Sequence, residues 1–456
     1  MDPRQENSRE YLRQVIDVEI KSLEESVREP IRALRHRRNA LAPISSLPTE
    51  VFAAIFSFLR SPRTSSRESG KPSWLCITHV CHQWREIALN NPLFWSHIDF
   101  DSIPLAGAAE MLARAKKAPL HLEAMVTGSH WDDARLSAFK KELRSRVSHI
   151  CHLSFIAHSS LLSDTLKLLV SPAPTLESLS LSILPDYKHR YPPPASIPDT
   201  LFDGATPRLS CLELRRCNIS WKSPLLKGLR CLEVFSPSKH ERPSLADWLD
   251  ALDEMPRLKK LVLQSASPIA PPFPFNIERT RTVTLPFLAD MDISASVGDC
   301  ALTLSHLVLP ALTRLYITAK SMLPNGADML EFLPYVARHS HGPHDMRPLQ
   351  DVLIRSAWKR IEIFAWLGID ARTYNFTTPL GAMTTTSRVA LSVTCRNWLR
   401  ETNIEVLDVA MAALPIDNLV KLTAIESTRL DEEFWRRHAM APARVRAAGS
   451  HCSTWI

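Results

Sequence analysis

Glycine is scarce in this sequence, with 11 residues against 34 prolines in a chain of 456. Loops that cradle phosphates depend on glycine, and neither G-x-G-x-x-G nor G-x-x-x-x-G-K-[ST] occurs. The G-x-S-x-G, H-E-x-x-H and Cys-x-x-Cys patterns of hydrolases, metalloproteases and metal ribbons are also missing. We therefore expect a protein that is not an enzyme, with no catalytic residues, no metal and no cofactor.

Long hydrophobic runs are absent as well. There is no N-terminal apolar signal segment and no run of about 18 apolar residues, so neither secretion nor a membrane-spanning segment is expected. The nine cysteines, an odd number, are scattered. This pattern predicts reduced thiols in a cytoplasmic or nuclear protein. The net charge is +7, but only Arg35, Arg37 and Arg38 form a dense basic stretch, which argues against a nucleic-acid partner.

Residues 1–43 are predicted to form an amphipathic helix. Leu12, Ile16, Leu23 and Val27 share one stripe, and charged residues fill the other faces. Pro30 lacks the amide donor that a helix interior needs, so we expect a kink or break there. The stripe can pack on its own protein or pair as a coiled coil, and the short, irregular heptads favour the first.

A second helical region follows. Leu47-Pro48-Thr49-Glu50 is a helix start signal, after which Val51, Ile55, Phe58 and Leu59 recur at helical spacing. Residues 60–71 are predicted to form a loop, and the next helix carries an apolar face that consists of Ile77, Val80, Cys81, Trp84, Ile87 and Ala88. Leu93, Phe94 and Trp95 close the region as an apolar latch. About 50 residues cannot cover two such apolar helices, which indicates that one side meets a partner.

The order and spacing of these segments resemble the F-box domain. The matching segments are Leu47-Pro48-x-Glu50, Ile55-Phe56-x-Phe58-Leu59, Val80-Cys81-His82-x-Trp84-Arg85-x-Ile87-Ala88 and Asn91-Pro92-Leu93-Phe94-Trp95-Ser96-x-Ile98. The preceding Arg37 to Ile44 segment is similar to the F-box-like proteins of mushroom-forming fungi. Residues 44–100 are therefore interpreted as a helical F-box-like domain.

The resemblance implies an adaptor function. F-box domains dock on a Skp-family adaptor and thereby tie a substrate receptor to a cullin ubiquitin ligase. By motif position, the adaptor-binding residues would be Leu47, Pro48, Glu50, Ile55, Leu59, Val80, Trp84 and Ile87. A Trp at helical spacing is also a common core residue, so for Trp84 both roles stay open. The loop at residues 60–71 and Phe94 depart from the usual pattern.

The rest of the chain repeats a short strand pattern. An apolar residue recurs at i, i+3 and i+5, in the copies Leu176/Leu179/Leu181, Leu209/Leu212/Leu214, Leu229/Leu232/Val234, Leu258/Leu261/Leu263 and Leu312/Leu315/Ile317. Weaker copies are Ile150/Leu153/Phe155, Leu349/Val352/Ile354 and Ile404/Leu407/Val409. The copy that continues to Cys217 and Ile219 matches the leucine-rich-repeat template. Ser244 to Glu254, an amphipathic helix, precedes the fourth copy.

The predicted fold is therefore α/β, an N-terminal helical F-box module followed by an irregular leucine-rich-repeat solenoid. The solenoid spans residues 101–425 and a C-terminal tail residues 426–456; a conventional α/β sheet is the alternative. The predicted function is the substrate receptor of a Skp–cullin–F-box ubiquitin ligase, whose concave repeat sheet recruits an unknown protein substrate. The alternative is a scaffold that binds protein or RNA without any ligase.

Overall fold

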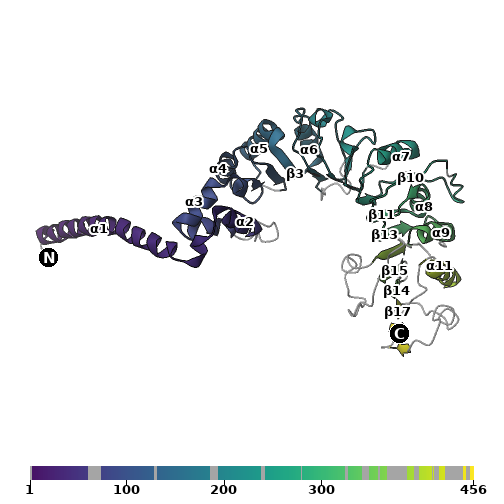
Figure 1. The fold of residues 1–456 in the computed structure, drawn as a ribbon. Helices are drawn as coiled ribbons and strands as arrows, with labels where there is room; N and C mark the ends of the chain where they lie inside the picture. Colours follow the sequence, from purple (N-terminus) through teal and green to yellow (C-terminus); the bar gives the residue numbers. More distant parts are fainter. Residues whose placement is uncertain are drawn as a thin grey trace. The chain divides into compact units, whose positions relative to one another are not determined.

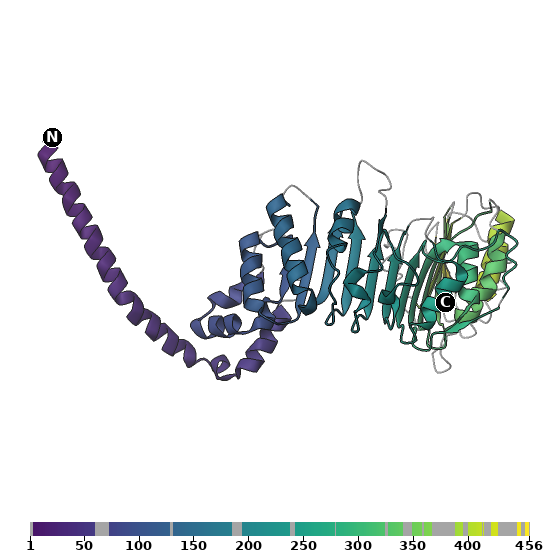
Figure 2. The same ribbon diagram turned by 90° about the horizontal axis from the view of Figure 1, so that it is seen from above.

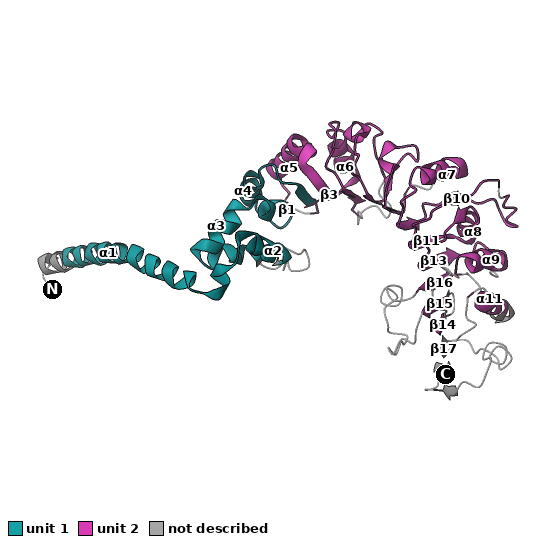
Figure 3. Cartoon of the chain, viewed as in Figure 1, with its two compact units in different colours: residues 1–123 teal, residues 124–456 magenta. Residues whose placement is uncertain are grey.

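The computed structural model describes residues 3–59, 73–127, 131–184, 194–237, 242–278, 280–323, 327–340, 349–357, 360–366, 388–394, 400–412, 414, 421–426, 445–447 and 452–455. The chain forms two compact units, Met1–Glu123 and Ala124–Ile456 (Figure 3). Unit 1 extends beyond the boundary at residue 100 that the sequence predicts for the F-box-like domain.

Unit 1 is mainly helical. Its elements are α1 (Pro3–Ala40), η1 (Pro43–Ser46), α2 (Thr49–Leu59), η3 (Ser73–His79), α3 (His82–Asn90), η4 (Pro92–Trp95), β1 (His97–Asp99), α4 (Leu105–Ala115) and β2 (Leu120–Met125). Strands β1 and β2 pair in parallel, with Ile98 opposite Leu122. The helices of residues 44–95 are those that the apolar spacing predicts, apart from a break described below.

Helix α1 runs through Pro30 as one helix, so of the kink or break that the sequence predicts there, the break does not occur. Its apolar stripe is exposed: Leu12, Ile16, Leu23 and Val27 each keep half or more of their surface accessible. The prediction that this stripe packs on its own protein is therefore wrong for the residues that the structure describes. Among the described helices, none has both the length and the apolar content that crossing a bilayer requires.

The helix predicted over Ile77 to Ala88 is in fact two elements. The 3-10 helix η3 ends at His79, and α3 begins at His82. Cys81 between them has φ −157° and ψ 172°, an extended conformation that no helix can contain. Ile77 is consequently buried, whereas Val80, predicted on the same face, is exposed.

Unit 2 is an α/β structure in which helices alternate with strands (Figure 1). From its start to the end of β13 it contains α5 (Asp133–Arg146), η5 (Val147–His149), β3 (Ile150–Ala157), α6 (Ser159–Leu166), β4 (Ser178–Ile183), β5 (Ala195–Ser196), η6 (Leu201–Gly204), β6 (Cys211–Arg215), β7 (Cys217–Asn218), η7 (Pro224–Leu226), β8 (Cys231–Phe235), α7 (Leu245–Asp253), β9 (Lys260–Gln264), β10 (Val283–Thr284), β11 (Asp290–Ser296), α8 (Val297–Ser305), β12 (Leu307–Val308) and β13 (Arg314–Lys320). Then follow α9 (Asp328–Ser340), β14 (Asp351–Ala357), β15 (Arg360–Trp366), β16 (Val389–Thr394), α11 (Arg400–Ala412), β17 (Lys421–Glu426), β18 (Val445–Ala447) and β19 (Cys452–Trp455).

From β3 to β13 the main sheet is parallel and follows chain order, β3-β4-β6-β8-β9-β11-β13 (Figure 2). Backbone hydrogen bonds also link the turns before successive strands: Ser210 N donates to Glu177 O, Arg230 N to Ser210 O, Lys259 N to Arg230 O, and Ala289 N to Lys259 O. Each passage from turn to strand thus repeats the geometry of the one before. This repeated geometry explains why the same short apolar pattern recurs along the sequence.

The apolar positions of the pattern form the core of unit 2. In β6, Leu212 and Leu214 are buried, while Cys211 and Glu213 beside them are only half-buried. Side chains that alternate along a strand point to opposite faces, so the leucines share one face of the sheet. Helices α6, α7, α8, α9 and α11 lie on one side of the strands (Figure 1). The polar positions therefore lie on the other face, which we call the open face.

After β13 the strand order departs from chain order and becomes β13-β16-β15-β14-β17-β19-β18. Strand β16 is parallel to β13, but β15 is antiparallel to both β16 and β14. The copy at Leu349 is a strand, as expected, whereas the copy at Ile404 falls within helix α11, so the strand prediction there is wrong. In the predicted tail, β19 pairs with β17 and β18, so the sheet continues past residue 425.

Candidate functional site

An aromatic core holds the helices of the predicted F-box-like region together. Phe52 and Phe56 of α2 are fully buried. The Trp84 ring of α3 lies 5.7 Å from that of Phe52 and 5.4 Å from that of Phe56, and Phe94 of η4 lies 5.8 Å from Phe56. Tilted and edge-on ring pairs at such distances add stabilisation beyond apolar burial. Helices α2 and α3 are thereby fixed to each other and to η4.

The segment after α3 closes this core, as the sequence predicts for a latch. The Asn91 side chain accepts a hydrogen bond from Leu93 N at 3.2 Å and so begins η4. The buried Trp95 indole donates to Ala88 O at 2.7 Å, near the end of α3. Phe94 and Trp95 are buried, but Leu93 points outward and is 55% exposed. The latch thus leaves one large apolar side chain on the surface.

Other apolar side chains of the same region are exposed too. Phe58 is 80% exposed, Val80 is 56% exposed, and Leu41, Ile44 and Val51 also lie on the surface. Phe56 and Phe58 stand two positions apart in α2, so the helix directs them to different sides, one into the core and one to solvent. Apolar surface that a module leaves exposed costs free energy in water unless a partner covers it.

A hollow of about 570 Å³ lies between the start of α2 and the end of α3. It is lined by Thr49, Glu50, Ala53, Gln83, Glu86, Ile87, Asn90, Asn91, Pro92 and Leu93. Ala53, Ile87, Pro92 and Leu93 give it an apolar floor, and Glu50 and Glu86 are acidic and exposed. An apolar centre with a polar edge is the composition of many protein-binding surfaces.

The predicted adaptor-binding residues differ in accessibility. Pro48, Glu50 and Val80 are exposed, and Leu47, Ile55, Trp84 and Ile87 are half-buried; the Leu59 side chain lies outside the described residues. The Pro48 carbonyl accepts hydrogen bonds from Val51 N and Phe52 N, which places Pro48 directly before the first turn of α2. Only Glu50 and Ile87 of this set line the hollow.

Trp84 packs chiefly within the module. Its contacts with Phe52 and Phe56 favour the core role over the interface role, the two roles that the sequence leaves open. Phe58, Leu93 and Val51, by contrast, were absent from the predicted adaptor-binding set although they are among the accessible apolar residues. Helical spacing alone could not separate Val51 and Phe58 from their buried neighbours, because both rows on α2 are apolar.

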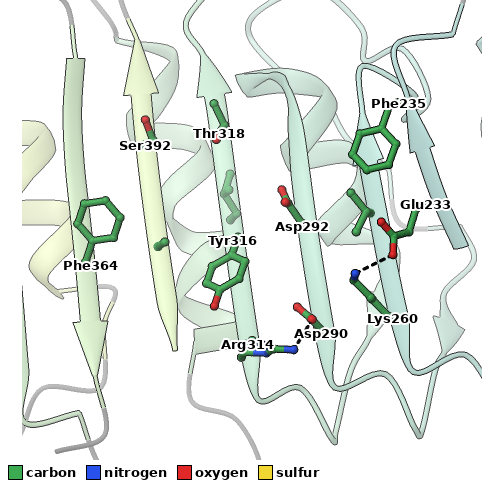
Figure 4. Close-up of a pocket in the computed structure, with 13 residues that line it drawn as sticks. Glu233, Phe235, Lys260, Asp290, Asp292, Arg314, Tyr316, Thr318, Phe364 and Ser392 are labelled. Atoms are coloured by element: carbon green, nitrogen blue, oxygen red, sulfur yellow. Dashed lines mark hydrogen bonds and ion pairs between the residues drawn. The ribbon is translucent and has the colours of Figure 1, made fainter. Parts of the chain in front are cut away.

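A second candidate surface is the open face of the sheet in unit 2, most of whose side chains are half-buried. The register aligns its side chains in rows across the strands: one row contains Ser154, Ser180, Glu213, Glu233, Val262, Asp292 and Tyr316. A pocket of about 260 Å³ opens here across β8, β9, β11, β13, β16 and β15 (Figure 4). No sequence pattern indicates this pocket, since its residues come from strands far apart in the chain.

Comparison with known proteins identifies one region of the chain. Residues 44–101 match the sequence model of the F-box-like family, described as F-box-like. No curated protein and no solved structure matches the chain. The match covers the helices built around Phe52, Phe56 and Trp84, and it confirms the resemblance seen in the sequence. An F-box-like domain indicates, in general terms, an adaptor role in a ubiquitin ligase.

Proposed function

Because residues 44–101 form an F-box-like domain, we propose that this protein is the substrate-receptor subunit of a Skp–cullin–F-box ubiquitin ligase. The module docks on a Skp-type adaptor, and the open face of unit 2 recruits a protein substrate. In this proposal the protein binds the adaptor and the substrate and catalyses no reaction itself. It acts in the cytoplasm or the nucleus. Its leading segment, Arg37 to Ile44, supports an assignment to the F-box-like proteins of fungi.

One observation carries the docking proposal: the module exposes Phe58, Val80 and Leu93 although it has an aromatic core in which to bury apolar groups. Burial of apolar surface contributes about 25 cal/mol per Å² removed from water. Leu93 also lines the hollow, whose apolar residues and acidic side chains have the composition of a protein interface core with a polar edge. The adaptor would cover them.

We further infer that strands β3 to β13 are degenerate leucine-rich repeats. Three features support this: chain-order parallel pairing, buried residues at i+3 and i+5, and turn-to-turn hydrogen bonds between successive copies. Cys217, after the copy at Leu209, is buried with its Sγ 3.7 Å from Leu181 O, where a small residue fits the corner. Repeats of this kind present a broad surface for a protein partner.

The docking proposal is tested by co-purification with the Skp-type adaptor. Val80→Asp and Phe58→Asp each place a charge where the adaptor would bury an apolar side chain, so we expect co-purification to be lost. Matched controls are Val170→Asp and Phe287→Asp, which change the same residue types at sites that are each 56% exposed in unit 2. The controls should co-purify the adaptor as the wild type does.

The double substitution Leu47→Ala and Pro48→Ala tests the start of α2, with loss of the adaptor again expected. If the adaptor co-purifies equally with wild type and with all module variants, the docking assignment is wrong. The circular dichroism spectra of the variants should match that of the wild type, since all these side chains lie at least partly on the surface.

A further inference from the structure

The pocket on the open face contains an excess of negative charge. It is lined by Lys260 and Arg314, which are cations, and by the three carboxylates of Glu233, Asp290 and Asp292 (Figure 4). Lys260 Nζ lies 2.7 Å from Glu233 Oε1, and Arg314 forms an ion pair with Asp290. Both cations are therefore engaged by other carboxylates, and Asp292 forms no ion pair or hydrogen bond with the described residues.

The register explains why Asp292 has no such partner in the part of the sheet that the structure describes. Its cross-strand neighbours in the pairing of β11 are Val262 of β9 and Tyr316 of β13, and neither carries a positive charge. Burial, and then the neighbouring carboxylate of Asp290, raise the pKa of the Asp292 carboxyl to about 6. Lys260 acts in the opposite direction and Glu233 adds to the rise. The ionised carboxylate is thus a site where an added cation would be stabilised.

The other side of the pocket is largely apolar, although Thr318 and Ser392 also line it. Tyr316 packs against a buried cluster of Leu353, Phe364, Trp366 and Ala390, and Phe364 and Ala390 also line the pocket. Phe235 closes the opposite end, where the Arg215 guanidinium already lies 3.9 Å from the centre of its ring. A hydrated metal ion would gain little from such walls. A long aliphatic stem that ends in a positive charge matches both sides.

We propose that this pocket receives a basic side chain, lysine or arginine, from the protein that the open face recruits. The methylene stem packs along Tyr316, and the charged head reaches Asp292. At about 260 Å³ the pocket is smaller than the sites of about 300–1,000 Å³ that hold small molecules, so it suits a single side chain. The inference rests on the proposed role of unit 2 in substrate recruitment and specifies the chemistry that it selects.

The test uses the full chain and an array of synthetic peptides. The peptides share one Gly-Ser-Leu context and differ at the central position, which is lysine, arginine, norleucine or glutamate. We expect the wild-type chain to retain the lysine and arginine peptides and to bind the norleucine and glutamate peptides about tenfold more weakly, as loss of a charge-assisted contact predicts. Norleucine keeps the stem and removes the charge.

The decisive variant is Asp292→Asn, which keeps the side-chain shape and removes the charge. It should abolish the preference for lysine and arginine over norleucine. Asp247→Asn, the same change at the start of α7 outside the pocket, should leave that preference intact. Equal binding of all four peptides by the wild type, or a preference that persists in Asp292→Asn, would overturn the proposal.

Adaptor co-purification on the same preparations reports on the proposed function separately. If the adaptor binds but the peptides show no preference, the pocket assignment alone fails. If the peptides show the preference and the adaptor is lost, the ligase role fails while the pocket stands.

Discussion

The F-box-like module and the sheet of unit 2 present opposite chemistry at their accessible surfaces. The module exposes Phe58, Val80 and Leu93, whereas the open face of the sheet presents Glu233, Asp292 and other polar side chains. Apolar surface provides affinity with little selectivity, and arranged charges provide selectivity and speed of association. The difference matches the two proposed tasks, attachment to a common adaptor and choice among substrates.

The two surfaces also differ in how their chemistry arises. On α2 of the module, exposed and buried phenylalanines are neighbours in a single helix, so the packing of that helix decides which are accessible. On the sheet, strands such as β4, β6 and β8 alternate buried and half-buried positions, and a pocket forms only where distant strands align. These two arrangements can be tested by substituting a buried and an exposed residue of the same helix or strand and comparing the losses of stability.

The largest effect is expected within α2. Phe56→Ala removes a fully buried ring that touches Phe52, Trp84 and Phe94 and should reduce the free energy of unfolding by about 3–5 kcal/mol. Phe58→Ala, two residues away, should change it by less than about 0.5 kcal/mol. Urea unfolding followed by circular dichroism measures both. Similar losses for the two variants would contradict the distinction between core and surface phenylalanines.

A comparable contrast is expected between neighbours in β6. Leu214 is fully buried, so Leu214→Ala should cost about 2–5 kcal/mol of stability through the lost contacts and the cavity left behind. Glu213, on the open face, forms a 2.6 Å ion pair with Arg215 that is half exposed, and Glu213→Ala should cost about 0–1 kcal/mol. Thermal unfolding of the two variants measures both losses of stability. A costly Glu213→Ala would show that the open face contributes to folding rather than to binding.

The smallest effect is expected for Asp292, where a substitution should raise the stability of the protein instead of lowering it. The pKa of Asp292 rises from an ordinary 3.8 to about 6, so its ionised form is disfavoured in the folded state. At about 1.4 kcal/mol per pKa unit, ionisation lowers stability by about 2–3 kcal/mol, an upper bound for a group that is partly accessible. The wild type keeps its full stability below pH 3.8 and loses this increment as the pH rises through 6.

Asp292→Asn should therefore be more stable than the wild type above pH 6, with the gain shrinking to nothing near pH 4. Chemical unfolding at about pH 4, 5, 6 and 8 measures this profile. Glu233, Asp290, Lys260 and Arg314 face the same pocket and are unchanged in the variant, so the difference between the two profiles isolates Asp292. A gain that does not depend on pH would mean that burial of the charge is not its cause.

Much of the fold could be predicted from local patterns. The i, i+3, i+5 pattern located β4, β6, β8, β9, β13 and β14, because alternate burial in a strand is written directly into the residue order. The same pattern at Ile404 misled, because the buried residues there, Val406, Leu407, Ala410 and Met411, recur at the spacing of a helix. The break at Cys81 was missed because the apolar periodicity continues across it while the backbone does not.

The order of the strands beyond β13 could not be predicted either. Strand β16 follows β15 in the chain but lies between β15 and β13 in the sheet, an arrangement that depends on long-range pairing. The F-box-like region was easier, because its motif residues occur in order within about 55 positions. Even there the sequence could not separate Phe56 from Phe58 as core and surface, since both fit the apolar spacing.

The sequence by itself determined where the F-box-like module lies and which positions of the strands are buried, because both follow from contacts between residues close together in the chain. Only the tertiary structure decided that Asp292 lies between Val262 and Tyr316 while Lys260 and Arg314 are engaged elsewhere. The reason is physical. Where copies of the apolar pattern were recognised, they also align the strands, since the hydrophobic pattern sets the register. No copy was recognised on β11, so the neighbours of Asp292 are known only from the pairing of β11 with β9 and β13.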